Sequence, residues 1–196
     1  MDLGFSMEEA KAIEANFKKL YAHSIEWVNE KLRIAAYTGY VPLAYGLQLK
    51  TPLLKQSVVG STKTPYEASA EGRTAGNALG QSYGLVNSFA AVQMQQRILN
   101  SRYATRILPC AQIHDAQYYI VDNDIELLEW FNRNLIECME NHMCPELDHD
   151  TVKIGAELDI FYPDWAHAVT LPNRATEENI ATLAEAHIQK VVKNDP

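Results

Sequence analysis

Apolar residues recur at helical spacing through the N-terminal part of the chain. Ser6-Met7-Glu8-Glu9 is a capping box, with Ser at the N-cap and Glu at N3. The apolar or small residues that follow at this spacing are Ala10, Ile13, Phe17, Leu20, Trp27, Leu32 and Ala35. The pattern predicts one long helix over about residues 6–37, and Gly39 is placed to end it.

A second long helix is predicted after an irregular stretch. Residues 40–62 mix short apolar runs with Pro and Gly, which indicates short strands and loops. Thr64-Pro65-Tyr66-Glu67 then begins a helix, with Thr as the cap, Pro at N1 and Glu at N3. We expect this helix to continue to about Asn100.

The pattern changes to a hairpin over residues 107–121. Two apolar runs flank a polar centre, which predicts a β-hairpin with His114 and Asp115 at its tip, between strands apolar enough to be central in a sheet.

The remaining elements alternate helix and strand. Asn123 at the N-cap and Glu126 at N3 predict a helix with a buried face of Ile125, Leu128, Phe131, Leu135 and Met139. A strand is predicted over Val152 to Leu158, and Thr176-Glu177-Glu178 begins a last helix that ends near Val192. This order of elements predicts an α+β fold.

Composition agrees with a folded globular chain of one domain, or one and part of another, at 47% apolar and 21% charged residues. No apolar run is long enough to span a membrane, and the N-terminus does not resemble a secretory signal. Three cysteines form no disulfide framework, which favours a reducing compartment, and we expect a cytoplasmic location.

The net charge of −8 hides an asymmetry along the chain. Residues 1–106 contain 12 Lys and Arg against 8 Asp and Glu, whereas residues 107–196 contain 5 against 17. Phosphate binding depends on the local field, so a basic segment beside an acidic one suits a polyanion in one place and a metal cation in another. A solvated basic surface explains the same charges, and charge alone favours that interpretation.

Asp115 at the predicted hairpin tip is the sharpest candidate for chemistry. A carboxylate fixed on rigid strands near a basic segment suits a divalent cation that also touches phosphate. An Asp at a tight turn is also a common turn former, so both interpretations remain open on this evidence.

The second helix has two stripes with a period of four residues. Gly72, Gly76, Gly80 and Gly84 form one, although each costs roughly 1 kcal/mol of helix propensity relative to Ala. Arg73, Asn77 and Gln81 form a polar stripe beside it. Tight helix packing with a solvated edge explains the glycines, but it does not explain three aligned long donors.

Cys138, His142, Cys144 and His149 are a rival cluster of zinc-type ligands, and Cys138 and His142 are expected to share a helix face. Their spacing matches no common zinc pattern, and a helix end followed by a loop explains it. The sequence contains no Gly-x-Ser-x-Gly elbow, so a serine hydrolase has no support.

Four segments resemble family A DNA polymerases in the same order. Arg73-Thr-Ala-Gly-Asn77-Ala-Leu-Gly-Gln81 resembles a helix of that family, and Gln112-Ile113-His114-Asp115 resembles its motif C, usually Gln-Val-His-Asp-Glu. Gly39-Tyr40-Val41 followed by Gly46 is similar to an upstream segment, Gly-Tyr-Val followed by Gly-Arg-Arg. Gly155 and Asp164-Trp165 are similar to the C-terminal strand and Trp turn, so the resemblance extends from about Gly4 to His167.

The resemblance implies a role for each candidate residue. Asp115 would bind the catalytic Mg²⁺ pair, and His114 would lie at the primer terminus. Arg73, Asn77 and Gln81 would contact phosphates and the minor-groove edge of primer-template DNA. The glycine stripe would let the helix backbone approach the duplex or the hairpin closely. Residues 1–170 would be the C-terminal palm and fingers part of a polymerase domain, and residues 171–196 a helical extension.

The sequence also departs from the family pattern. Ala116 replaces the usual Glu after the catalytic Asp, and Leu47-Gln48 replaces the usual Arg pair. Motif A, with the other metal-binding Asp, and motif B, which holds the incoming dNTP, are not found in the chain.

We therefore expect a partner, an N-terminal polymerase half carrying motifs A and B, as in a split, phage-type polymerase in a bacterial host cytoplasm. The helix that begins at Ser6 is expected to contribute to that interface. The alternative is a non-catalytic DNA-binding or structural remnant, for which Ala116 is the best argument.

Overall fold

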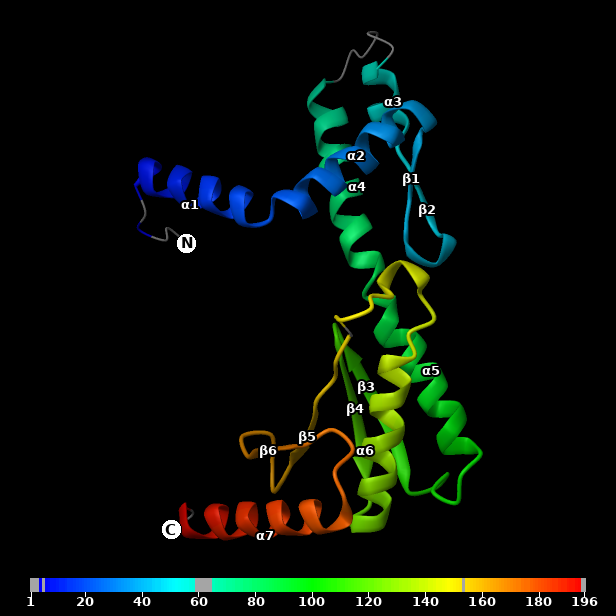
Figure 1. Cartoon of the computed structure of the whole chain (residues 1–196), viewed down its shortest axis with the longest axis vertical. Helices are drawn as coiled ribbons and strands as arrows, with labels where there is room; N and C mark the ends of the chain where they lie inside the picture. Colours follow the sequence, from blue (N-terminus) through cyan, green and yellow to red (C-terminus); the bar gives the residue numbers. More distant parts are fainter. Residues whose placement is uncertain (1–3, 5, 59–64, 153, 195–196) are drawn as a thin grey trace. The chain divides into compact units, whose positions relative to one another are not determined.

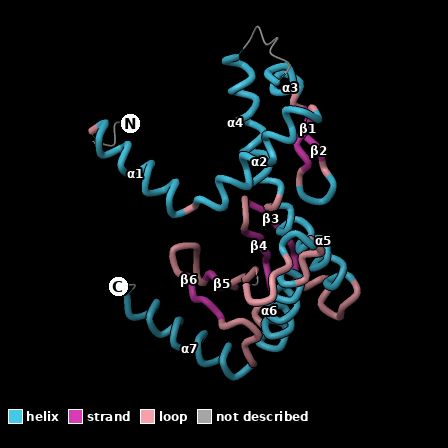
Figure 2. Tube along the Cα trace, turned by 45° about the horizontal axis from the view of Figure 1, so that its top comes forward, coloured by secondary structure: helices cyan, strands magenta, loops and turns pink. Residues whose placement is uncertain are grey.

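The computed structural model describes residues 4, 6–58, 65–152 and 154–194. The chain divides into two compact units, Met1–Tyr83 and Gly84–Pro196. Helices and small two-stranded antiparallel sheets make up both units, so the predicted α+β class is confirmed (Figure 1, Figure 2). Within the described part of the chain, no helix is long and apolar enough to cross a membrane.

The first unit begins with two helices, α1 (Met7–Leu20) and α2 (Ala22–Thr38). The predicted capping box is confirmed, because the Glu9 N–H donates to Ser6 Oγ at 3.2 Å and the Ser6 N–H donates to Glu9 Oε2 at 2.8 Å. Gly39 ends α2 with a left-handed φ of 87°, as predicted. The prediction of one unbroken helix is wrong, because Tyr21 leaves helical geometry at φ −106° and ψ 28°.

The segment after α2 folds back onto it. Strands β1 (Tyr40–Pro42) and β2 (Gln48–Lys50) pair around the short 3₁₀ turn η1 (Ala44–Gly46), which confirms the predicted short strands. The helix α3 (Pro52–Val58) was not predicted. The predicted cap Thr64 lies outside the described residues. The small core of this unit consists of Ala35, Val41, Ala75 and Leu79.

The predicted helix to Asn100 is two helices, α4 (Pro65–Ser82) and α5 (Leu85–Leu99). Ser82 gives a physical reason for the interruption. Its buried hydroxyl donates back to the Leu79 carbonyl at 2.8 Å and accepts from the Ala44 N–H at 3.0 Å. A Ser side chain that bonds back to a carbonyl of its own helix competes with the backbone hydrogen bonds and bends the helix. Helix α4 therefore ends at Ser82, where the side chain also bonds to Ala44.

The second unit contains the predicted hairpin, formed by β3 (Ile107–Ile113) and β4 (Ala116–Val121). The register is irregular between Pro109 and Ala111, which places a β-bulge at Cys110. The prediction that these strands are central is wrong, because the sheet has two strands and every residue of β3 after Ile107 is exposed.

Helix α6 (Ile125–Glu140) follows the hairpin, and its N-cap is Asp124, whose side chain accepts from the Leu127 N–H. The predicted cap, Asn123, is therefore wrong by one position. The buried face includes the predicted Phe131 and Leu135, whereas Ile125 is exposed. Leu127, Asn132, Ile136 and Cys138 complete it, and Leu128 and Met139 pack partly buried against the core.

A short 3₁₀ turn η2 (Pro145–Leu147) leads to the last elements. Strand β5 (Leu158–Phe161) pairs with β6 (Ala168–Leu171), and α7 (Glu177–Asn194) follows. The predicted strand over Val152 to Leu158 is wrong, because pairing with β6 begins only at Leu158. The predicted last helix is confirmed, and Thr176 Oγ1 accepts from the Asn179 N–H at its start.

One buried cluster joins α5, α6, β5, β6 and α7 in this unit. Its residues are Ala90, Met94, Ile98, Tyr103, Ile107, Leu127, Phe131, Leu135, Cys138, Leu158, Leu171, Ala175 and Ile180. The fully buried Asn132 ties α6 to the turn before α7, since Nδ2 donates to the Pro172 carbonyl and Oδ1 accepts from the Ala175 N–H.

Candidate functional site

The predicted hairpin tip is a two-residue loop, His114-Asp115, between the last cross-strand pair, Ile113 and Ala116. Both loop residues are exposed. His114 has a left-handed backbone at φ 53°, a conformation that is uncommon outside Gly but several-fold enriched for His. The sequence therefore predicted the position of the tip correctly.

The tip is held against the first turn of α5 by Asn87, which is buried at 4% exposure. Asn87 Nδ2 donates to the His114 carbonyl at 3.3 Å. Gln117 Nε2, on β4, donates to Asn87 Oδ1 at 2.6 Å and to the Asn87 carbonyl at 3.0 Å. The Tyr119 hydroxyl donates to Gln117 Oε1 at 2.6 Å. A chain of hydrogen bonds thus runs from the strand interior to the loop backbone.

The other strand is anchored to the same turn of α5. Gln112 Nε2, on β3, donates to Ser88 Oγ at 2.9 Å. Neighbouring residues of one helix therefore hold both strands of the hairpin next to its tip. Sequence reasoning missed Asn87, Ser88 and Gln117, although Gln112 and Gln117 are polar interruptions of otherwise apolar runs and gave a signal.

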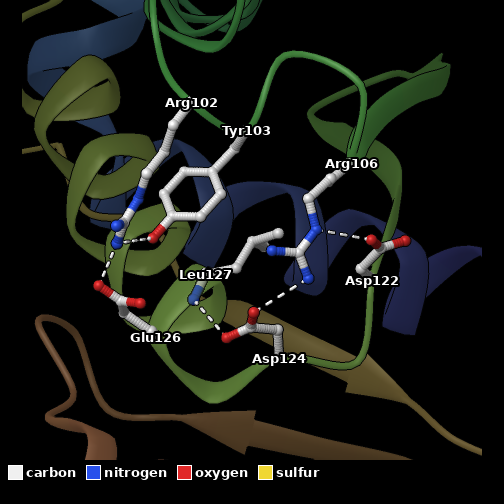
Figure 3. Close-up of polar contacts among 7 residues, drawn as sticks. All are labelled: Arg102, Tyr103, Arg106, Asp122, Asp124, Glu126 and Leu127. Carbon is white, nitrogen blue, oxygen red and sulfur yellow. Dashed lines mark hydrogen bonds and ion pairs between the residues drawn. The ribbon is translucent and has the colours of Figure 1, made fainter.

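The open end of the hairpin is fastened by Arg106 (Figure 3). Its guanidinium contacts the Asp122 carboxylate at 2.7 Å and the Asp124 carboxylate at 2.9 Å. The Leu127 N–H, which donates to the Asp124 side chain, and Arg106 together lower the pKa of that carboxyl. The N-cap of α6 is therefore also a partner of the hairpin base.

A second ion pair lies beside the first. Arg102 contacts Glu126 and also donates to the Tyr103 hydroxyl at 2.7 Å (Figure 3). The Tyr103 ring packs against Trp130 of α6, with ring centroids 5.3 Å apart. These contacts fix the α5–β3 connection to the first turns of α6.

The turn between β5 and β6 contacts the hairpin through aromatic rings. Trp165 stacks on Tyr118 of β4, with centroids 5.1 Å apart. Asp164 holds the turn, because its carboxylate contacts His167 Nδ1 at 2.8 Å and accepts from the Ala166 N–H at 2.9 Å. The hydrogen bond from His167 and that from Ala166 lower the pKa of the Asp164 carboxyl.

The predicted polar stripe lies on α4, in the first unit. Arg73, Asn77 and Gln81 are all exposed, and their spacing of four residues places them on one face. Arg73 also donates to Ser69 Oγ at 3.1 Å, one turn before it. The stripe is thus exposed along its length.

The glycine stripe packs partly within the protein. A Cβ on Gly76 would lie 3.5 Å from Val28 of α2, and one on Gly72 would lie 3.8 Å from Leu54 of α3. A Cβ on Gly80 would meet nothing within 4 Å. A Cβ would make only ordinary van der Waals contact at Gly72 and Gly76, so close helix packing does not by itself explain glycine at these positions.

The rival zinc ligands do not converge. Cys138 is buried in the core, and α6 ends at Glu140, so His142 does not share its helix face as predicted. The buried His142 ring accepts from the Cys144 N–H, and His149 Nδ1 accepts from backbone N–H groups of its own loop. Among the described residues, no group of three or more Asp, Glu, His or Cys side chains is placed to hold a metal.

Asp115 alone is a partial ligand set for Mg²⁺. Its exposed carboxylate offers the hard oxygen donor that Mg²⁺ prefers, and protein sites for this ion often use one or two carboxylates together with substrate phosphates and water. Asp115 thus offers one such oxygen, and no other described Asp, Glu, His or Cys joins it in a metal-binding group of three or more.

No family model matches this sequence, and no curated protein matches it.

Proposed function

We propose that this chain supplies part of the active site of a family A type DNA polymerase, completed by a partner polypeptide carrying motifs A and B. The observation that carries the proposal is the hairpin tip. His114 and Asp115 are exposed on a two-residue loop whose backbone a buried amide holds. A carboxylate that shares a metal ion with a substrate phosphate needs this combination of rigidity and access.

Each residue has a distinct task in this proposal. Bound Mg²⁺ supplies charge neutralisation at the transferred phosphate and favours ionisation of the primer 3′-hydroxyl. Asp115 offers a ligand oxygen, and His114 contacts the primer end. Arg73, Asn77 and Gln81 donate to phosphates and to the minor-groove edge. Minor-groove acceptors occupy similar places in every base pair, so these donors test pair shape without reading sequence.

The single carboxylate at the tip supports the need for a partner. Two-metal phosphoryl transfer would need more carboxylate ligands than Asp115 alone offers. One Asp does not position two ions, so we assign the second Asp, and the side chains that hold the incoming dNTP, to the partner. The chain alone is expected to lack polymerase activity.

The hairpin offers a surface for that partner. Leu108 and Ile120 are a cross-strand pair, 52% and 62% exposed, and Ile113 is also exposed nearer the tip. Within the described residues, each strand pairs on one side only. Apolar sheet faces and open strand edges are where another chain adds. We expect an obligate interface on the order of 2,000 Å² or more.

A non-catalytic DNA-binding or structural remnant is the second candidate. Ala116 favours it, because an accessory carboxylate would be expected there in a complete motif C. The joint retention of Asp115, His114, Arg73, Asn77 and Gln81 favours the enzyme, since a remnant has little reason to keep all five.

Reconstitution tests the proposal. The chain is mixed with a polypeptide carrying motifs A and B, and primer extension is measured with and without Mg²⁺. Asp115→Asn should abolish extension and leave DNA binding nearly intact. Asp159→Asn, an exposed carboxylate on β5, should change neither and serves as the control. Substantial extension by Asp115→Asn would refute the assignment, and a stable, inactive monomer that binds no partner would favour the remnant.

A further inference from the structure

Asn87 differs from the other polar residues around the hairpin because its amide is buried. A buried amide without partners is costly, so its hydrogen bonds decide its orientation. Its Nδ2 donates to the His114 carbonyl, and its Oδ1 accepts from Gln117 at 2.6 Å. Both side-chain bonds therefore point toward the hairpin tip rather than along the helix that carries Asn87.

Two backbone carbonyls, which only accept, fix the direction of this hydrogen-bond chain. The Asn87 carbonyl accepts from Gln117 Nε2, and the His114 carbonyl accepts from Asn87 Nδ2. Gln117 Oε1 therefore faces Tyr119 and accepts from its hydroxyl. With Oδ1 accepting from Gln117, the Asn87 amide is left to donate its own N–H to the loop.

The hydrogen bond from Asn87 acts on the loop backbone, because its acceptor is the His114 carbonyl. The His114 carbonyl belongs to the peptide plane that joins His114 to Asp115. That plane follows a left-handed residue at φ 53°, which a non-Gly residue keeps when its surroundings stabilise it. Holding the carbonyl therefore holds the plane from which the Cα of Asp115 continues.

We infer that Asn87 is a positioning residue, whose buried amide orients the His114–Asp115 peptide and thereby sets the direction in which the Asp115 carboxylate leaves the hairpin. Gln117 supports this orientation by donating to Asn87 Oδ1, and Tyr119 supports Gln117 by donating to its Oε1. The catalytic consequence rests on the proposed function, whereas the orientation of the loop does not.

A buried Asn that only stabilises the fold is the alternative, and the chain offers a matched control for it. Asn132 on α6 is also buried, and its Nδ2 also donates to a carbonyl, that of Pro172. Its Oδ1 accepts from a backbone N–H, that of Ala175. Asn87→Ala and Asn132→Ala therefore remove the same group with similar burial, but at different ends of the unit.

Hydrogen exchange measured by mass spectrometry on the full chain separates the two roles. In Asn87→Ala, amides from Asp115 to Gln117 should exchange roughly tenfold faster, while those of β5 and β6 change little. Asn132→Ala should give the reverse pattern. Tyr119→Phe, which removes only a hydroxyl, should loosen the tip in the same direction by a smaller factor, and it keeps the test valid if Asn87→Ala folds poorly.

A second readout uses the reconstituted complex with its partner. In Asn87→Ala, the Mg²⁺ concentration for half-maximal primer extension should rise several-fold, because the ligand is no longer held in place. Asn132→Ala should leave this concentration unchanged even where it lowers the melting temperature.

The outcomes separate this inference from the proposed function. Uniform faster exchange in Asn87→Ala, or equal effects of both Asn variants at the tip, would overturn the positioning role. Selective loosening of the tip in a chain that never supports extension would establish the positioning role and refute the polymerase proposal.

Discussion

The two compact units differ in how much core supports the residues on their surface. Among the residues that the structure describes, thirteen buried residues form the core cluster of Gly84–Pro196, whereas four form that of Met1–Tyr83. Helix α1 has no buried residue, and Ile13, Phe17 and Leu20 are exposed on it. The hairpin therefore belongs to the unit with the larger core, while the α4 stripe belongs to a unit with a smaller core and exposed apolar residues. We expect the second unit to be the more stable one.

The largest expected effect on stability comes from removing a central side chain of the larger core. Phe131 is buried and meets Tyr119 edge-on, with ring centroids 5.0 Å apart. Phe131→Ala should destabilise the second unit by about 3–5 kcal/mol, because it loses burial and leaves a cavity beside the hairpin. Urea denaturation followed by intrinsic fluorescence measures this loss.

Two controls locate the effect. Leu99→Ala, at an exposed position of the same unit, should change stability by no more than about 0.5 kcal/mol. Leu79→Ala, in the core of the first unit, should shift a separate, earlier transition. A single transition that moves equally with both buried variants would contradict two units of unequal stability.

A second test concerns the exposed stripe of the less stable unit. Arg73→Ala should weaken DNA binding by the reconstituted complex on all sequences, and it should reduce the slope of log K against log salt by about 1. Gln81→Ala should impair extension most from mispaired primer ends. Binding titrations over a salt series measure the first effect.

The control is Arg33→Ala, which removes another exposed cation, one that is paired with Glu30. Its salt slope should match that of the unchanged protein. If Arg73→Ala and Arg33→Ala behave alike, the α4 stripe is not a DNA contact.

A smaller effect is expected at the N-terminus of α1. Ser6→Ala removes one half of the capping box and should cost about 1 kcal/mol of helix stability. Because α1 has no buried contacts to compensate, helical circular dichroism should fall measurably. Asn16→Ala, on the same helix, should preserve or raise the signal, and a loss there equal to that of Ser6→Ala would show that the cap is not the cause.

The smallest expected effect is a pH dependence at the hairpin base. The Leu127 N–H and Arg106 lower the pKa of Asp124 from its ordinary value of 3.8. A carboxyl with a lowered folded-state pKa contributes stability above its unfolded pKa and loses it as the pH falls through the folded value. The second unit should therefore weaken below pH 3.8, and Asp124→Asn should flatten this dependence in denaturation curves. An unchanged acid limb would contradict the role of this pair.

Local signals in the sequence predicted the fold where the deciding contacts are local. The Ser6 capping box and the Gly39 end involve residues within one turn of helix, and both are confirmed. The hairpin tip followed from two apolar runs around a polar pair. Predictions were wrong where a residue distant in sequence determines the structure. Asn123 was an equally good N-cap in sequence, but Arg106 pairs with Asp124, which is the N-cap in the structure.

The candidate site divides in the same way. His114 and Asp115 are adjacent, so their shared loop was predictable. Asn87 lies thirty positions before Gln117, and no periodicity links an amide on a helix to one on a strand. The end of α4 was missed for the same reason. The Ser82 hydroxyl accepts a hydrogen bond from the Ala44 N–H, and Ala44 lies in the 3₁₀ turn η1, far away in sequence.

The bulge in β3 has a consequence for identical copies of this chain that meet one another. An open apolar hairpin invites identical strands to stack edge to edge in a continuous cross-β ladder. Pro109 contributes no N–H to such a ladder, and the extra residue at Cys110 shifts its register immediately afterwards. A continuous stack of identical strands would be interrupted at this point. A single added strand could pair with the regular part of β3 nearer the tip, from Ala111 to Ile113. We therefore expect the irregular strand to disfavour fibril growth.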